Sequence, residues 1–199
     1  MSQNRWLQMI EENPSHSQWY IERFRAMAES GDDLHGEARL IDAMAKRGSR
    51  VLDAGCGTGR VGGWLGDRGH TVVGVDLDPE LIAVANADHP NATWIVGDLS
   101  EFQLADQGIN ERFDLAVCAG NVMTFLDPAT RGAVLTNVAG HLASGGRLVV
   151  GFGRDRGYAF EDFFADVAEA GLHEAVRLAT WDLQPFTNDA DFLVAVLEH

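Results

Sequence analysis

The stretch Val51-Leu52-Asp53-Ala54-Gly55-Cys56-Gly57-Thr58-Gly59-Arg60 places three glycines directly after a short apolar run. The apolar run is typical of a buried strand, and Val61, Trp64 and Leu65 beyond it share one helical face. Glycine has no Cβ, so the backbone can approach a ligand closely, and the start of the following helix offers unpaired N–H groups. The stretch therefore predicts a strand, a glycine-rich ligand-binding loop and a helix.

The rest of the chain repeats this alternation of apolar runs and helical patterns. The expected strands are Arg50–Ala54, Thr71–Asp76, Thr93–Val96, Phe113–Ala119 and Gly146–Phe152. Strands alternating with helices form a parallel sheet. Two more runs, Leu172–Leu183 and Asp191–Glu198, have a short connection, which requires antiparallel pairing. We expect an α/β fold with a doubly wound, seven-stranded sheet, mostly parallel, whose last strand is antiparallel.

The first 48 residues are helical in character. Ser15 and Gln18 have the spacing of a capping box, and Tyr20, Phe24 and Met27 then form one apolar stripe. A second helix is expected over about residues 35–46, with Gly48 as its C-cap. We expect residues 1–48 to form a helical cap or lid over a domain of residues 49–199, the two together making one compact domain.

The composition restricts the kinds of molecule that this chain is expected to bind. The chain has 15 Lys and Arg against 30 Asp and Glu, a net charge of −15, and no large basic cluster. Because phosphate neutralisation supplies much of the affinity for nucleic acids, this balance disfavours DNA or RNA. We also expect no membrane partner and a cytoplasmic location, since the sequence shows neither an apolar run long enough to span a bilayer nor a signal-peptide pattern.

The cysteines and histidines show no metal-binding pattern. Cys56 and Cys118 lie far apart in the chain, and the seven histidines are scattered singly. In a cytoplasmic chain such cysteines are expected to be free thiols, and no metal site is predicted.

The spacing of the glycines, together with the position of one acid, indicates which class of nucleoside ligand the loop binds. The dinucleotide fingerprint is G-x-G-x-x-G/A, but its sixth position, counted from Gly55, is occupied here by Arg60. Asp76 ends the second expected strand, about 20 residues after the loop, where a carboxylate can accept both hydroxyls of a ribose. Asp76 is compatible with NAD or with another nucleoside ligand. Arg60, in contrast, departs from the dinucleotide fingerprint and so disfavours NAD.

The pattern D-x-G-x-G-x-G over residues 53–59 resembles the first motif of class I S-adenosylmethionine (SAM)-dependent methyltransferases. Later segments resemble further motifs of that family in the same order, as far as about Gly153. The resemblance implies a Rossmann-like fold and SAM as cofactor. It implies that SAM is bound by Asp53, Gly55, Cys56 and Gly57 of the loop, Asp76 and Leu77 at the ribose, Asp98 and Leu99 at the adenine, and Ala119 and Asn121 near the methionine part.

The function implied is transfer of the SAM methyl group to a small-molecule acceptor, with N, O, S or C as the attacked atom left open. The Asn/Asp-Pro-Pro-aromatic tetrapeptide of enzymes that methylate DNA bases or glutamine is absent, and Ala-Gly-Asn-Val stands at residues 119–122. A hydroxyl acceptor would need a general base, for which His16 and His35 of the expected cap are candidates. Two alternatives are an NAD-type oxidoreductase and a SAM-binding protein without catalysis.

Overall fold

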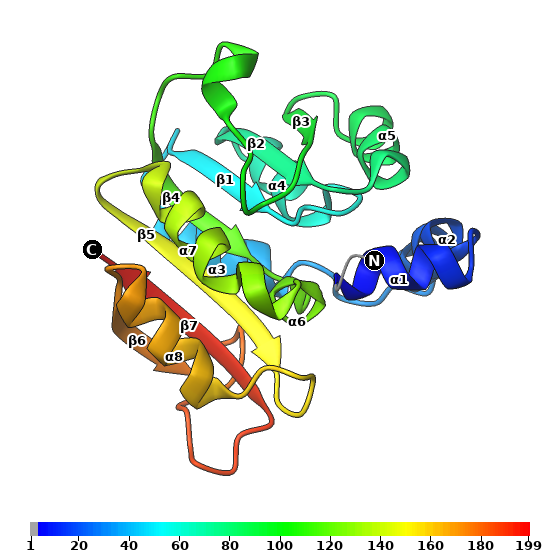
Figure 1. The fold of residues 1–199 in the computed structure, drawn as a ribbon. Coiled ribbons are helices and arrows are strands. Elements are labelled where there is room, and N and C mark those ends of the chain that lie inside the picture. Colours follow the sequence, from blue (N-terminus) through cyan, green and yellow to red (C-terminus); the bar gives the residue numbers. More distant parts are fainter. Residues whose placement is uncertain (1–3) are drawn as a thin grey trace.

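The computed structural model describes residues 4–199, and its centre is a seven-stranded sheet in the order β3-β2-β1-β4-β5-β7-β6 (Figure 1). The strands are β1 (Arg50–Ala54), β2 (Thr71–Asp76), β3 (Thr93–Val96), β4 (Phe113–Cys118), β5 (Leu142–Gly153), β6 (His173–Leu178) and β7 (Phe192–Glu198). The five strands β1 to β5 pair in parallel, and β7 is antiparallel to both β5 and β6. The predicted fold class is confirmed.

The C-terminal hairpin differs in detail from the expectation. The run Leu172–Leu183 was expected to be one strand, but β6 ends at Leu178. The chain turns there because Ala179 N donates to Gln184 O at 2.9 Å, and Leu183 adopts a positive φ of 73°. Alternation of apolar residues continues past the turn, so the sequence pattern overestimated the length of the strand.

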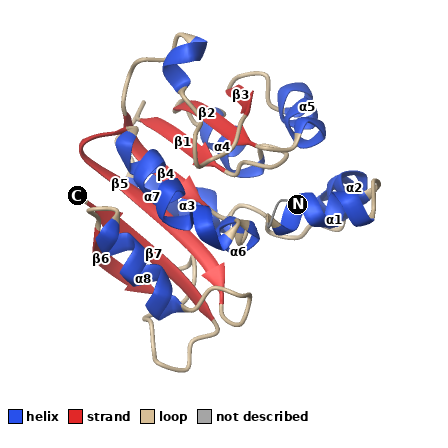
Figure 2. Ribbon diagram, in the orientation of Figure 1, coloured by secondary structure: helices blue, strands red, loops and turns tan. Residues whose placement is uncertain are grey.

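Helices cover both faces of the sheet (Figure 2). The packing of buried side chains puts α3 and α4 on one face, beside α5, and α7 and α8 on the other. The helices are α1 (Arg5–Glu12), α2 (His16–Glu29), α3 (Gly36–Met44), α4 (Arg60–Gly66), α5 (Pro79–Asp88), α6 (Val122–Phe125), α7 (Arg131–Gly140) and α8 (Phe160–Glu169), with short 3-10 helices η1 (Leu104–Gln107) and η2 (Pro128–Thr130). Within residues 4–199, none of these helices has the length and apolar character needed to cross a membrane.

Two expected helix ends are wrong. Ser15 precedes α2, but its side chain makes no capping hydrogen bond, and Gln18 donates to Glu80 of α5 at 2.8 Å instead. Helix α3 ends at Met44 with the extended residue Ala45 as its C-cap, and Gly48 lies in the following turn. At Gln18 the observed contact joins the N-terminal region to another element, which local sequence rules do not describe.

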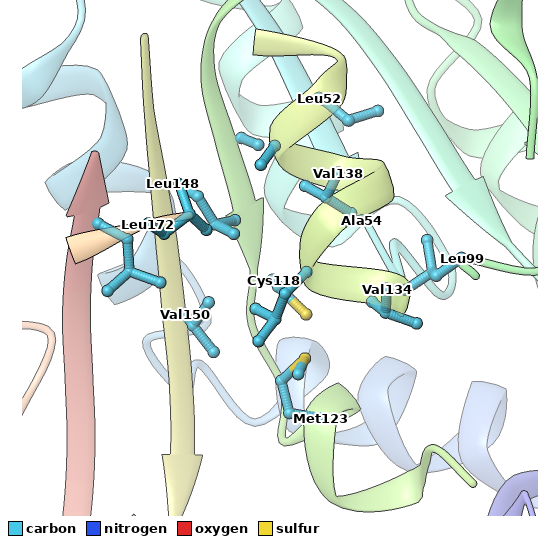
Figure 3. Close-up of a cluster of buried hydrophobic side chains, with 14 of the residues drawn as sticks. Leu52, Ala54, Leu99, Cys118, Met123, Val134, Val138, Leu148, Val150 and Leu172 are labelled. Carbon is cyan, nitrogen blue, oxygen red and sulfur yellow. The ribbon is translucent and has the colours of Figure 1, made fainter. Parts of the chain in front are cut away.

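The main core lies between the sheet and the pair α7 and α8. Apolar side chains of β1, β4 and β5 meet α7 there, and Met123 of α6 closes the end of the cluster beside Cys118 (Figure 3). The side chains of Phe113, Phe152 and Phe163 are fully buried. Burial of each such ring stabilises the fold by about 1.5–3 kcal/mol relative to exposure. This core fixes the strand ends from which the candidate site is built.

Candidate cofactor site

The candidate site lies where the strand order changes direction, at the carboxyl ends of β1 and β4. These two strands are neighbours, while β2 and β3 extend to one side and β5 to the other. Open α/β sheets bind ligands in the crevice at such a switch point. A pocket occurs there, lined by Asn4, Trp6, Tyr20, Gly55, Gly57, Asp76, Leu77, Leu81, Asp98, Leu99, Gly120, Val122, Phe125 and Leu126.

The glycine-rich loop forms the floor of the pocket. Gly55 and Gly57 have positive φ angles of 79° and 54°, which favour glycine. A Cβ on Gly55 would lie 2.5 Å from a methyl group of Val122, so the loop and α6 approach closely only because that atom is missing. The backbone of the loop is thereby exposed to a ligand at the end of β1.

Trp94 of β3 packs against the third glycine and holds the loop against the sheet. A Cβ on Gly59 would lie 2.8 Å from the indole ring of Trp94, and one on Gly62 would lie 2.9 Å from it. The indole Nε1 donates to the carbonyl of His89 at 2.9 Å, which fixes the ring. The sequence analysis did not predict this contact. The feature of the sequence that could have indicated it is the pair of glycines near the start of α4.

Asp76 presents its carboxylate at the end of β2. Its Oδ2 accepts from Gly57 N at 2.8 Å and its Oδ1 accepts from Asp78 N at 3.0 Å. Burial raises the pKa of Asp76, and the hydrogen bonds from the backbone of Asp78 and Gly57 oppose that rise. The carboxylate therefore orients the glycine loop and lines the pocket, where it can also accept hydroxyl groups of a ligand.

The end of β3 provides Asp98 and Leu99. Asp98 Oδ1 accepts from both the backbone N–H and the hydroxyl of Ser100, at 2.8 and 2.7 Å. Leu99 is buried, and its carbonyl accepts from Asn137 of α7 at 3.1 Å. The pocket wall on this side thus combines a carboxylate with an apolar side chain whose position is fixed by α7.

The structure divides the predicted cofactor residues into two groups. Gly55, Gly57, Asp76, Leu77, Asp98 and Leu99 line the pocket, and Asp53, Cys56, Ala119 and Asn121 lie outside its lining. Asp53 is buried and accepts from Gly62 N at 2.8 Å, and burial raises its pKa to about 7. Asn121 Oδ1 accepts from Gly153 N at 2.8 Å and so joins the end of β4 to the end of β5.

The first two helices cover the pocket from the side of β2. Asn4, Trp6 and Tyr20 belong to its lining. Trp6 Nε1 and Ser17 Oγ both donate to Oδ2 of the buried Asp78, at 2.9 and 2.5 Å. The other carboxylate oxygen of Asp78 caps α5 by accepting from Glu80 N at 2.8 Å. Figure 1 shows α1 and α2 beside α6, off the edge of the main body.

The expected cap of residues 1–48 has two parts in the structure. Helix α3 packs into the body, because Ala38 and Ile41 are fully buried against strand side chains. Only α1 and α2 contribute side chains to the pocket, and residues 1–3 lie outside the described residues. We use the term N-terminal cap below for residues 4–30 alone.

Neither predicted base candidate lines the pocket. The ring of His16 packs between Trp6 and Trp19, with centroid distances of 4.9 and 5.3 Å. His35 packs beside Trp64 at 5.9 Å, and burial lowers its pKa. Tyr20 does line the pocket, but burial raises the pKa of its hydroxyl to about 12.

Arg60, which argued against a dinucleotide site, is held by Glu37 of α3 and by Leu34 before that helix. Its guanidinium pairs with both carboxylate oxygens of Glu37, at 2.7 and 2.9 Å, and donates to the carbonyl of Leu34. It also lies over the ring of Phe24, 5.5 Å from the centroid. Arg60 therefore connects the glycine-loop helix to the N-terminal cap.

Comparisons with known proteins identify the family. Residues 51–146 match the family model described as a methyltransferase domain. The crystal structure of a TehB-like SAM-dependent methyltransferase from Corynebacterium glutamicum is 50% identical, with a TM-score of 0.88, over 93% of this chain and 98% of that one. A dTDP-3-amino-3,6-dideoxy-alpha-D-glucopyranose N,N-dimethyltransferase from Streptomyces fradiae is 32% identical over 60% of this chain.

The curated relatives are longer proteins. The chain spans 47% of the Streptomyces fradiae enzyme and 59% of a ubiquinone biosynthesis O-methyltransferase from Xylella fastidiosa, which is 33% identical over 68% of this chain. The Corynebacterium glutamicum protein, in contrast, is matched over nearly its whole length. The glycine loop, the acids that follow β2 and β3 and this full-length similarity lead to one conclusion: the chain belongs to the class I SAM-dependent methyltransferases.

Proposed function

We propose that this chain transfers the methyl group of SAM to a small-molecule acceptor in the pocket beneath the N-terminal cap. The observation that carries the proposal is the position of Trp6 and Tyr20, which close the pocket formed by the glycine loop and Asp76. A covered pocket excludes water and suits an acceptor small enough to enter it. The relatives named for an amino-sugar nucleotide and for ubiquinone biosynthesis support a small acceptor.

Each wall of the pocket has a proposed role. Gly55 and Gly57 would bring the loop backbone close to SAM, and Asp76 would accept the ribose hydroxyls. Asp98 and Leu99 would face the adenine, as the family resemblance implies. Gly120, Val122 and Phe125 would then lie on the side of the methionine part and the acceptor. The roles predicted for Asp53, Cys56, Ala119 and Asn121 would be indirect, through the strand ends and the loop that they hold.

Bound SAM supplies a methyl group on a cationic sulfur, and the chain supplies binding and orientation. Holding the two reactants at about 3–3.5 Å in line contributes several kcal/mol by reducing orientational entropy. Among the described residues the pocket lining includes no histidine, and burial raises the pKa of the Tyr20 hydroxyl to about 12. We therefore infer that the acceptor attacks with its own lone pair, without a proton-accepting role for His16 or His35.

A turnover screen tests the proposed function. The chain would be incubated with SAM and panels of small amines, phenols, thiols and carboxylic acids, and release of S-adenosylhomocysteine would be measured. The same mixture without the protein is the control for uncatalysed transfer. We expect at least one class of acceptor to raise product release above that control. Binding of S-adenosylhomocysteine without turnover on any panel would favour the alternative of a SAM-binding protein that is not an enzyme.

A further inference from the structure

A second pocket adjoins the cofactor pocket at α6. It is lined by Arg5 of α1, by Thr124 and Phe125 of α6, and by Arg154 and Arg156 of the loop after β5. Phe125 belongs to the lining of both pockets, so the two pockets meet at this residue. We call this second pocket the arginine pocket. Figure 1 shows the loop after β5 beside α6.

The arginine pocket is unusually positive for this chain. The whole sequence has 15 Lys and Arg against 30 Asp and Glu, yet among the described residues that line this one pocket three are arginines and Asp155 is the only acid. Across residues 4–199, none of the three arginines takes part in an ion pair. The described residues that line the arginine pocket therefore carry a net positive charge.

Two of the arginines are held by backbone carbonyl groups. Arg154 donates from Nε to Ala190 O at 2.8 Å and from Nη2 to Asn188 O at 3.1 Å, and it lies over the ring of Phe160. Arg5 donates to the carbonyl of Arg156 at 2.9 Å, which joins α1 to the loop after β5. Carbonyl groups orient a guanidinium without cancelling its charge, so both side chains are positioned and still cationic.

Arg156 is the arginine with free hydrogen-bonding capacity. Among the described residues its guanidinium makes neither a hydrogen bond nor an ion pair. The side chain lies over Gly153, the last residue of β5, where a Cβ would come within 2.9 Å of Arg156 Nε and 3.6 Å of Asn121 Oδ1. Gly153 thus leaves room for the guanidinium at the carboxyl edge of the sheet, beside the predicted methionine side of the cofactor pocket.

We propose that the arginine pocket binds an anionic group of the methyl acceptor, either a carboxylate or a phosphate. This inference rests on the proposed function, because it assigns a substrate class to that same site. A guanidinium presents paired donors that match both anions, and three unpaired charges favour an acceptor with negative charge over a neutral one. The anion would lie on the far side of Phe125 from SAM, so that the nucleophilic end of the acceptor reaches past that ring toward the methyl group.

Binding of small aromatic probes tests the proposal without knowledge of the acceptor. The full chain, saturated with S-adenosylhomocysteine, would be titrated calorimetrically with benzoate, with phenyl phosphate and with the neutral isostere benzamide. We expect at least one anion to bind at least about tenfold more tightly than benzamide, as expected for one charged hydrogen bond. Tighter binding of phenyl phosphate would assign a phosphate group to the acceptor, and tighter binding of benzoate would assign a carboxylate.

Substitution of Arg156 tests whether the anion binds in the arginine pocket. The Arg156→Gln variant removes the charge without removing a side-chain hydrogen bond or ion pair to any described residue, and we expect it to weaken anion binding at least about tenfold. Arg156→Lys should recover part of the loss. Arg23→Gln, on the exposed face of α2, is the matched control and should bind the anions like the unmodified chain.

The outcomes separate this inference from the proposed function. Equal binding of benzamide and both anions, no anion binding, or unchanged anion affinity in Arg156→Gln would each overturn the arginine pocket as an anion site. In all three cases S-adenosylhomocysteine would still bind, so the proposed function would stand. Failure of S-adenosylhomocysteine itself to bind would instead overturn the proposed function.

Discussion

The indole N–H of Trp6 donates to the carboxylate of Asp78 across 2.9 Å and joins the first helix of the chain to the N-cap of α5. Asp78 in turn donates its backbone N–H to Oδ1 of Asp76, the carboxylate assigned to the ribose. One buried acid therefore connects the position of the N-terminal cap with the orientation of the candidate cofactor ligand. The predictions begin from this connection.

Removing the indole donor should loosen the N-terminal cap. In Trp6→Phe the ring still fills its place beside Tyr20 and Phe125, but Asp78 keeps only Ser17 as a partner from the cap. Loss of one hydrogen bond to a charged group costs about 1.5–3 kcal/mol. We expect faster hydrogen exchange over residues 5–29 and weaker binding of S-adenosylhomocysteine, both measured on the folded variant.

The control for this change is Trp19→Phe. Trp19 lies on α2 and is 50% exposed, so the same substitution there removes no contact with Asp78. Its exchange rates and cofactor affinity should match those of the unmodified chain. The connection through Asp78 would be discarded if both tryptophan variants exchanged and bound alike.

Substitution of Asp76 should weaken cofactor binding directly. Asp76→Ala removes the proposed acceptor of two ribose hydroxyls and the partner of Gly57 N. With charged hydrogen bonds contributing about 1.5–3 kcal/mol each, the affinity for S-adenosylhomocysteine should fall at least about tenfold. Calorimetry on Asp76→Ala, with the exposed Asp106→Ala as control, measures the loss. Equal affinities for the two variants would place the ribose elsewhere.

Asp53 predicts a pH dependence of stability. Burial raises its pKa to about 7 in the folded chain, against an ordinary value of 3.8. Between these values the folded chain keeps a proton that the unfolded chain releases. The contribution of Asp53 is therefore fully present below about pH 3.8 and is lost as the pH rises through about 7, with a slope of up to about 1.4 kcal/mol per pH unit.

The Asp53→Asn variant isolates that contribution. Its side-chain oxygen can still accept from Gly62 N, but it has no proton to lose. Denaturant unfolding at several pH values between 4 and 7 should give a flatter profile for this variant than for the unmodified chain. An exposed control, Asp67→Asn, should keep the original slope, and an identical slope in Asp53→Asn would contradict the assignment.

The two cysteines should resist alkylation while the chain is folded. Both are free and buried, and burial raises the pKa of Cys118 to about 12 and that of Cys56 well above its ordinary value. The thiolate is the reactive form, so neither should react with iodoacetamide near neutral pH. Mass spectrometry should find no modification of the native chain and two modified cysteines in denaturant. Rapid modification of native Cys56 would show that the glycine loop opens.

The sequence predicted the sheet well because the evidence for it is local. The apolar runs of β1, β2 and β3 have the bounds that the sequence predicted, since turn residues and helix caps such as Asp78 flank them. The antiparallel pairing of β7 followed from the rule that short connections join antiparallel strands. The turn after β6 escaped prediction because a hydrogen bond between Ala179 and Gln184, rather than composition, ends the strand.

The candidate site was only partly predictable. The motif gives positions along the chain, but not which side chains face the pocket, so Asp53 and Asn121 could not be separated from Asp76 in advance. Contacts between distant segments could not be predicted, because no residue near Trp6 in the sequence indicates a partner 72 positions away. The same holds for Arg156, whose guanidinium lies over Gly153 at the end of β5.

The central claim is that the pocket at the ends of β1 and β4 binds SAM. Calorimetric titration of the full chain with S-adenosylhomocysteine, and separately with NAD, tests it most directly. The account predicts one molecule of S-adenosylhomocysteine per chain and no comparable binding of NAD. Saturable binding of NAD by a chain that does not bind S-adenosylhomocysteine would contradict it.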